Sequence, residues 1–338
     1  MHIVLQPRLR RLAVLVGSTL SLWDLSTETP VARGSVDVPG ADNLNGCDAW
    51  LGVLAGRVAP AGASLRDATL HRVDWDLAAL SSPALGEVAR HTLSPSADGA
   101  WVVATNWKTG WVTVFDAATG AVRGANGESI PSGPSFSPDG TTVIAGAADQ
   151  GDGAVLRFDV TCVTEGKMAM SRMKKPGHGH PGLDDAPYFS VFSRDGASAA
   201  LSNESWGGRG ICVYDMTTGE PRWSATRPGS DEEPEAWFAF QAEFAANDRV
   251  LLLAGPRELR AFDAVTGTPL GAVPLPGDGR HGFAFDEPFW RVWVRGSTKG
   301  AAPVAVPLPD AWREGFAVTE PRAPRKRRAK KPTGSDAA

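Results

Sequence analysis

Apolar and polar residues alternate in short runs along most of the chain. In residues 154–160, AVLRFDV, every second position is apolar, with Leu156, Phe158 and Val160 on one face of an extended strand and Arg and Asp among the residues between them. This period of two is typical of a half-buried β-strand. Frequent turn residues, among them 38 Gly and 26 Pro, separate the runs. The pattern predicts many short antiparallel strands and leaves little room for long helices.

Two markers repeat along these strands. The first is a turn after an apolar strand, clearest in residues 136–140, FSPDG, where Pro restricts φ and Asp-Gly supplies the positive φ of a tight turn. Related sequences stand at residues 96–99, 192–196, 244–248 and 285–288. The second marker is an aromatic residue followed by Asp at the end of a later strand; these pairs end at Asp24, Asp76, Asp116, Asp159, Asp215 and Asp263.

The spacing of the second marker predicts a repeat architecture. Successive aspartates are 52, 40, 43, 56 and 48 residues apart, near the period of about 40–50 residues that is typical of propeller blades. In three units a Thr-Gly pair follows, with Gly four residues after the Asp, which predicts a turn into a fourth strand. The aromatic residues occupy equivalent strand positions, so we expect them to pack between sheets and not to bind a ligand.

These markers predict an all-β fold: a single seven-bladed β-propeller of four-stranded antiparallel blades over residues 1–312, with a disordered basic tail over residues 313–338. Neighbouring sheets would cover each other's faces, and a closed ring leaves only short edges. The predicted units are residues 2–38, 43–90, 91–123, 134–164, 188–225, 237–274 and 281–308. Two segments could supply the strand that closes the ring: residues 316–318 or the N-terminal strand.

The array resembles the WD-repeat β-propellers over residues 1 to about 310. Residues 20–25, LSLWDL, match the signature of that family's third strand, and residues 136–140 match its first-strand turn. The resemblance implies a rigid ring that binds proteins or peptides. Trp-Asp itself occurs only twice, and no Gly-His pair is in register, which argues against a buried Asp-His network. Residues 214–223, YDMTTGEPRW, also resemble the tryptophan-docking repeats of quinoprotein propellers, with Trp223 in the docking position.

Charge is distributed unevenly between body and tail. Residues 322–338 carry seven basic groups and one acid, so the remaining chain, with 27 basic and 37 acidic residues, has a net charge of −10. An acidic body offers no footprint for nucleic acid. The predicted partner is a protein or peptide, with a weak, salt-sensitive contact to nucleic acid or another anionic surface through the tail; its basic residues are Arg325, Lys326, Arg327, Arg328, Lys330 and Lys331.

The cysteines and the N-terminus bear on location. Cys47, Cys162 and Cys212 are widely spaced without a C-x-x-C pair, which argues against a disulfide framework or a structural zinc site and favours a reducing, cytoplasmic location. Residues 12–16 follow three arginines as in a secretory signal, but the apolar run ends at Gly17, so a strand is favoured. No window approaches the ~18 apolar residues of a membrane span.

The candidate binding residues lie in turns between the second and third strands of the blades, which gather on one rim. Two tryptophans fall in such polar, Gly-rich turns beside a basic residue, the usual composition of a binding hot spot. The alternative is that their rings fold back over the adjacent blade. The predicted binding set is Trp107, Lys108, Asp149, Asp152, Trp206 and Arg209.

No catalytic constellation accompanies these turns. The sequence contains no nucleophile elbow, no H-E-x-x-H and no phosphate-cradling Gly loop. His178, His180, Asp184 and Asp185 in a long Gly- and Pro-rich link could be metal ligands, but a surface loop is favoured. The predicted function is a non-catalytic interaction scaffold without cofactor or metal. The alternative is a propeller enzyme or a cofactor or metal binder, quinoprotein-like or lyase-like, that uses the central channel.

Overall fold

The structure, a computed structural model, consists almost entirely of β-strands. It describes residues 3–57, 66–86, 88, 93–106, 109–127, 130–148, 154–173, 187–204, 209–226, 241–255, 257–276, 282–295 and 301–314. The described helices are a 3₁₀ turn, η1 (Glu287–Phe289), and one α-helical turn, α1 (Ala311–Glu314). No helix in this part of the chain has the length and apolar character needed to span a bilayer. The predicted all-β class is confirmed.

The first half of the described chain forms three hydrogen-bonded sheets. The first holds β1 (Ile3–Gln6), β2 (Arg11–Val16), β3 (Thr19–Asp24) and β4 (Val31–Asp37). The second holds β5 (Ala41–Gly46), β6 (Leu51–Arg57), β7 (Arg66–Val73), β8 (Ala79–Ser81) and β9 (Ala84–Gly86). The third has eight strands: β10 (Ser94–Pro95), β11 (Trp101–Asn106), β12 (Trp111–Asp116), β13 (Val122–Asn126), β14 (Ile130–Phe136), β15 (Thr142–Ala148), β16 (Ala154–Thr164) and β17 (Lys167–Arg172).

The second half forms three smaller sheets. They are β18 (Pro187–Phe192), β19 (Ser198–Glu204), β20 (Arg209–Asp215) and β21 (Glu220–Thr226); β22 (Gln241–Ala245), β23 (Val250–Ala254), β24 (Glu258–Asp263) and β25 (Pro269–Pro274); and β26 (Phe283–Asp286), β27 (Arg291–Val294) and β28 (Val304–Pro307). Strand pairing thus yields six sheets where seven blades are predicted. In the eight-stranded sheet, two antiparallel runs are joined by a single parallel pair, Ala125 with Lys167.

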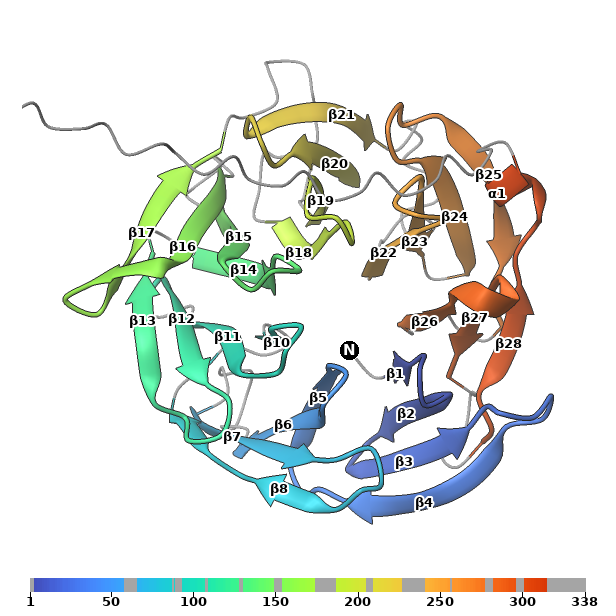
Figure 1. Cartoon of the computed structure of the whole chain (residues 1–338), viewed down its shortest axis with the longest axis horizontal. Coiled ribbons are helices and arrows are strands. Elements are labelled where there is room, and N and C mark those ends of the chain that lie inside the picture. Colours follow the sequence, from blue (N-terminus) through green and yellow to red (C-terminus); the bar gives the residue numbers. More distant parts are fainter. Residues whose placement is uncertain are drawn as a thin grey trace, which may run out of the picture.

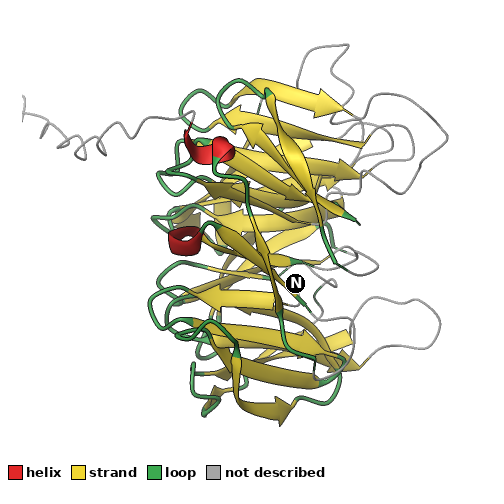
Figure 2. Ribbon diagram, turned by 90° about the vertical axis from the view of Figure 1, so that its right-hand side faces the viewer, coloured by secondary structure: helices red, strands yellow, loops and turns green. Residues whose placement is uncertain are grey.

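The sheets follow one another around a central axis in chain order, as in a β-propeller (Figure 1). Five of the sheets begin with their innermost strand and proceed outward in antiparallel order, whereas the eight-stranded sheet runs outward from β10 to β13 and back inward from β17 to β14. The turns between the first and second and between the third and fourth strands therefore emerge at one rim, where η1 and α1 also lie (Figure 2). We call this the turn rim. The hairpins between second and third strands lie at the opposite rim.

The repeated Ser-x-Asp-Gly turns have one side-chain geometry. In the β10–β11 turn, the buried Ser96 hydroxyl donates to Asp98 Oδ1 over 2.6 Å, and the Ala100 N–H donates to the same oxygen over 3.0 Å. The fourth turn residue, Gly99, has a φ of 71°, a left-handed conformation that favours glycine. Ser137 with Asp139 and Ser193 with Asp195 repeat the contact over 2.7 Å.

The strand-end aspartates stabilise the outer turns. Asp116 Oδ1 accepts hydrogen bonds from the Thr119 hydroxyl and the Thr119 N–H, both over 2.8 Å, and from the Ala118 N–H over 3.0 Å. These bonds, led by the one from the Thr119 hydroxyl, hold the pKa of Asp116 below its usual range. Gly120 follows with a φ of 75°. The predicted turn chemistry of the Asp-x-x-Thr-Gly sequence is therefore present.

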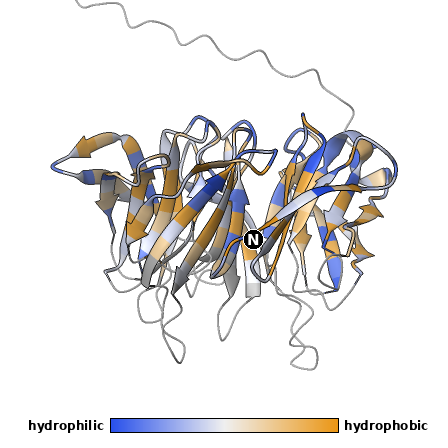
Figure 3. Cartoon of the chain, turned by 90° about the horizontal axis from the view of Figure 1, so that it is seen from below, coloured by the Kyte–Doolittle hydropathy of each residue, from blue (hydrophilic) through white to orange (hydrophobic). Residues whose placement is uncertain are grey.

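The repeated aromatic residues pack between neighbouring sheets, as predicted. Phe158 and Tyr214 are fully buried, and Trp23, Trp75, Phe115 and Phe262 are also buried; the set lies within the apolar clusters that link successive sheets. The hydropathy colouring shows these apolar strand segments between more hydrophilic turns (Figure 3). Core packing therefore accounts for the aromatic stripe.

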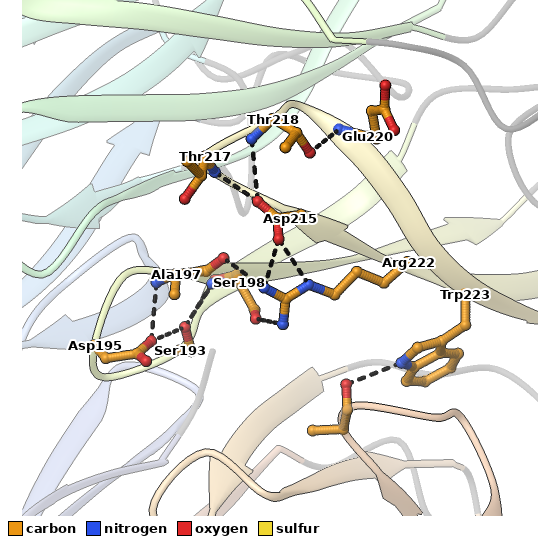
Figure 4. Close-up of polar contacts among 11 residues, drawn as sticks. Ser193, Asp195, Ala197, Ser198, Asp215, Thr217, Thr218, Glu220, Arg222 and Trp223 are labelled. Atoms are coloured by element: carbon orange, nitrogen blue, oxygen red, sulfur yellow. Dashed lines mark hydrogen bonds and ion pairs between the residues drawn. The ribbon is translucent and has the colours of Figure 1, made fainter. Parts of the chain in front are cut away.

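Trp223 links two sheets through a docking contact. Its indole N–H donates to a backbone carbonyl of the next sheet (Figure 4), that of Ala264, over 2.9 Å. Its ring stacks on Phe262 with centroids 6.1 Å apart. A Cβ on Gly267 would come within 2.7 Å of the indole, so this glycine provides the space as well as a φ of 74°. The adjacent Arg222 binds the Asp215 carboxylate over 2.7 Å and the Ser198 hydroxyl over 2.8 Å.

The predicted fourth unit ends too early. Its third strand, β16, continues to Thr164, and a turn at Glu165 and Gly166, both with positive φ, leads into β17. Residues 167–172, KMAMSR, contain no β-branched residue and do not alternate clearly, which is why the sequence pattern missed them. Met168 is nevertheless buried against the sheet.

The ring closes without a shared strand among the described residues. β1 pairs with β2 in the first sheet, so the N-terminal strand does not complete the last sheet, which has three described strands. Residues 316–318, the other predicted closing strand, lie outside the described residues. The seam is instead an apolar cluster that joins Ile3, Leu12 and Trp23 of the first sheet to Ala284 and Trp293 of the last.

A buried carboxylate fixes this seam. Arg10, in the β1–β2 turn, contacts Asp286 at the end of β26 through two bonds of 2.5 and 3.1 Å. Arg291 Nε and Trp293 Nε1 donate to the same fully buried carboxylate over 2.9 and 3.1 Å. Burial acts to raise the pKa of Asp286, but the hydrogen bonds from Arg10, Arg291 and Trp293 outweigh it and keep the pKa below its usual range.

We expect Asp286→Ala to lower the free energy of unfolding by about 3–5 kcal/mol, because it leaves two largely buried guanidinium groups without their carboxylate. Chemical denaturation monitored by tryptophan fluorescence measures the loss. The matched control is Asp310→Ala, which removes an exposed ion pair with Arg313 and should change stability by about 0–1 kcal/mol. Equal losses in the two variants would contradict a closing role for Asp286.

Candidate functional site

The inner strands enclose a channel along the ring axis with a volume of about 590 Å³. This volume lies within the range of about 300–1,000 Å³ that is common for small-ligand pockets. Residues from β1, β5, β10, β14, β18 and β22 line it, together with the turns that follow β10, β14 and β18. The channel is therefore built by side chains from most of the ring, and no single repeat contains it.

Side chains of one inner strand bond to the backbone of the next. The Ser190 hydroxyl on β18 donates to the Gly133 carbonyl on β14, and the hydroxyls of Ser135 and Ser190 are 2.8 Å apart. On the far side, the Gln241 amide on β22 donates to the Phe283 carbonyl over 2.8 Å and accepts from the Phe283 N–H over 2.9 Å. These bonds satisfy strand edges that face the channel.

A charged group lies at the turn-rim end of the channel. Arg194, in the β18–β19 turn, lines the channel, and its guanidinium bonds to Glu287 Oε2 of η1 over 2.7 Å. The Asp248 carboxylate accepts from the backbone N–H groups of Arg194 and Asp195 over 2.8 and 3.0 Å. Three successive sheets thus contribute to this end of the channel, which we call the channel mouth.

The turn that carries Asp248 is strained. Ala246, Asn247 and Asp248 have φ values of 49°, 52° and 65°, a left-handed run without glycine. Asn and Asp adopt this conformation more readily than other residues do, whereas Ala does not. The two hydrogen bonds to Asp248 hold the turn in place. Such strain is often stored at functional sites.

Glu243 lies beside this group, in the middle of the otherwise buried strand β22. Burial raises its pKa to about 8, and repulsion from Glu287 adds to the shift, while a hydrogen bond from the Phe285 N–H and attraction by Arg194 oppose it. The carboxyl is consequently mostly protonated at neutral pH. A perturbed acid beside an arginine and a cavity is a marker of functional sites.

The structure describes little of the predicted binding set. Trp107, Lys108, Asp149, Asp152 and Trp206 lie outside the described residues. The backbone of Arg209 is placed at the start of β20, opposite Glu204. The strands that flank these positions form the predicted hairpins, with Asn106 opposite Trp111 and Ala147 opposite Ala154. The basic residues of the tail, from Arg325 to Lys331, also lie outside the described residues.

Sequence reasoning missed the channel mouth. Arg194 was visible as the variable residue of an SRDG turn, and Glu243 as one charge within the apolar strand QAEFA. Neither signal shows that the two groups approach Glu287, because the three residues belong to three different repeats. Trp111, which is 45% exposed, is also absent from the predicted binding set.

Two further observations limit the chemistry of the site. Arg194 is the one charged side chain among the described residues that line the channel. Within the described ranges, no three His, Cys, Asp or Glu side chains come together in a way that could hold a metal ion. The histidines at 178 and 180, considered as ligands, lie outside those ranges.

Comparisons with known proteins support the fold. No protein-family model matches the chain, and no curated protein matches its sequence. Among solved structures, the chain is similar to hydrazine synthase of Kuenenia stuttgartiensis, with a TM-score of 0.57 and 16% sequence identity over 77% of this chain and 74% of that one. At this identity the likeness shows a β-propeller fold and no shared activity.

We expect Glu243→Gln to change the pH dependence of stability. Between the ordinary pKa of an unfolded glutamate, about 4.3, and the folded value of about 8, the unfolded wild-type chain releases a proton that the folded protein keeps. Wild-type stability therefore falls as pH rises through this window. The variant lacks this loss, so its stability relative to wild type should increase by about 2 kcal/mol or more from pH 5 to pH 9.

Denaturant unfolding at several pH values measures the difference. The matched control is Glu28→Gln, an exposed glutamate in the β3–β4 turn, for which the difference should stay flat with pH. A flat difference for Glu243→Gln as well would show that the carboxyl ionises normally in the folded protein.

Proposed function

We propose that the protein is a non-catalytic, cytoplasmic interaction module of the WD-repeat type that binds a protein or peptide partner. The two runs of the eight-stranded sheet are counted as separate blades in this proposal, which gives seven. The propeller fold supports a rigid binding ring, although fold alone does not determine function. The observation that carries the proposal is the exposed ring of Trp111.

Trp111 is the first residue of β12 and lies at the rim opposite the turn rim. It pairs with Asn106 of β11. Nearly half of its side chain is exposed, unlike the aromatic residues of the inter-sheet core. An exposed tryptophan brings a large apolar area to an interface and loses little side-chain conformational entropy on binding. Tryptophan is also enriched at binding hot spots. The turn that precedes it in the sequence contains the predicted binding residues Trp107 and Lys108.

The remaining predicted residues join this face through the repeat geometry. Because the runs β10–β13, β14–β17 and β18–β21 each pair their strands in chain order, the β15–β16 and β19–β20 hairpins open at the same rim as the β11–β12 hairpin. Asp149 and Asp152 fall within the first of these, and Trp206 and Arg209 fall within or at the end of the second. A partner would then contact loops of three blades at once.

The tail is proposed as a second, electrostatic contact. The described chain ends at Glu314, after Trp312 is buried beside Gly271 and Arg313 lies over the Trp290 ring. Residues 322–338 follow with a net charge of +6. Binding of a nucleic acid or another anionic surface through this segment would weaken steeply with salt.

The alternative, an enzyme or a cofactor binder that uses the channel, requires a general base, nucleophile or ligand set within it. The described lining residues include serine hydroxyls and Arg194 but no Asp, Glu, His, Cys or Lys. The proposal of an interaction module therefore rests on the exposed ring of Trp111 and not on the channel.

Affinity capture from a native lysate, with quantitative comparison of the retained proteins, tests the binding face. Trp111→Ala should reduce retention of a specific partner by about tenfold or more, the effect of losing a hot-spot residue. The matched control is Phe289→Ala, which removes a ring that is 59% exposed at the turn rim and should leave retention unchanged. The same loss in both variants, or in neither, would contradict the proposed face.

A further inference from the structure

The channel wall has the composition of a site for a hydroxylated ligand. Its polar side chains are hydroxyls and amides, with Ser94, Ser135, Ser190, Asn45 and Gln241 among them, and Phe136 and Phe189 add apolar surface. Such a mixture, with few charges, suits a neutral polar body more than a highly charged one. The one charged lining residue that the structure describes, Arg194, lies at the mouth.

The serine pair offers unused acceptors. Ser190 donates its hydroxyl hydrogen to the Gly133 carbonyl, so the 2.8 Å contact between the two hydroxyls requires Ser135 to be the donor. Ser135 then accepts no bond within the pair, and both of its lone pairs remain for a ligand hydroxyl. On another part of the wall, the Asn45 Nδ2 atom is buried and has no acceptor among the described residues. Buried donors of this kind call for an explanation such as a bound partner.

Arg194 offers unused donors at the mouth. A guanidinium has five N–H groups, and one nitrogen bonds to Glu287 while about two thirds of the side chain stays exposed. Its backbone is held independently by Asp248, so the side chain can change partners without loss of the turn. Glu243 is mostly protonated at neutral pH and places little negative charge beside it.

We propose that the channel binds a small hydroxylated carboxylic acid, of the sugar-acid class, with its carboxylate on Arg194 and its hydroxyls on the Ser135–Ser190 pair. An arginine binds a carboxylate through two parallel hydrogen bonds. Ser190 and Arg194 are four residues apart, at most about 13 Å along an extended chain. The long arginine side chain and the hydrogen bonds at both ends cover part of that distance, and a six-carbon chain bridges the remainder.

Glu287 competes with the ligand in this arrangement. Its carboxylate occupies the guanidinium that the ligand needs and repels an incoming anion. Removal of that charge should therefore strengthen binding. Tighter binding after removal of Glu287 would distinguish competition from a purely structural role for the ion pair. If the ion pair were only structural, its loss would weaken ligand binding or leave it unchanged.

Isothermal titration calorimetry of the full chain at pH 7 tests the proposal with gluconate and sorbitol, which differ in a carboxylate against a hydroxymethyl group. We expect gluconate to bind at least tenfold more tightly than sorbitol. Arg194→Gln should abolish that preference, Glu287→Gln should tighten gluconate binding several-fold, and Ser135→Ala should weaken both probes. Thermal melts confirm that each variant is folded.

The proposal is overturned if neither probe binds at 10 mM, if Arg194→Gln leaves the preference for gluconate intact, or if Glu287→Gln weakens binding in a folded protein. Trp111→Ala is the control for the separate interaction face, and it should leave gluconate affinity unchanged. Partner binding and gluconate binding can therefore fail independently.

Discussion

The closed ring depends on a seam that no backbone pairing holds in the described chain. Every sheet of a propeller needs a neighbour on each face, so the first and last sheets must meet although they are 276 residues apart at Arg10 and Asp286. The seam is an apolar cluster fixed by one buried carboxylate with three donor side chains. The buried charge of Asp286 is tolerated because each carboxylate oxygen accepts a hydrogen bond. Because the group is desolvated, removing the carboxylate or an arginine that bonds it strongly destabilises the fold.

Closure of the ring brings the inner strands around one axis and so forms the channel. In the β10–β11, β14–β15 and β18–β19 turns, serine and aspartate side chains form local hydrogen bonds, so these three carboxylates are committed to supporting their turns. The inner strands are less constrained by the repeat. Their side chains instead satisfy the exposed edges of adjacent inner strands, as Ser190 and Gln241 do, and they leave a polar lumen with little charge.

The channel mouth departs from this regularity. There a glycine-free left-handed turn, a glutamate whose pKa is raised by burial and an exposed arginine come together from consecutive sheets. The first two of these features cost free energy locally. The cost is backbone strain at Ala246 to Asp248 and desolvation at Glu243. The β10–β11, β14–β15 and β18–β19 turns instead use glycine and bonded aspartates. This concentration of exceptions at one end of one cavity distinguishes the mouth from the repeated scaffold.

Much of the fold was readable from the sequence because its determinants are local. A Ser-x-Asp-Gly turn needs only five residues to form, and an aromatic residue in a strand of period two faces the inter-sheet core whatever lies next to it. The strands, their order, the buried aromatics and the docking of Trp223 followed from such signals. The outer strand β17 did not, since its sequence has neither clear alternation nor β-branched residues.

The site was decided by tertiary structure. Arg194, Glu243 and Glu287 are spread over more than 90 residues, and only ring geometry brings them together, so no spacing rule reveals the ion pair or the raised pKa of Glu243. Closure was likewise undetermined, because several segments could complete a sheet equally well by propensity. The sequence by itself determined what each repeat is; the packing of one repeat on another determined the seam, the channel and the protonation of its acid.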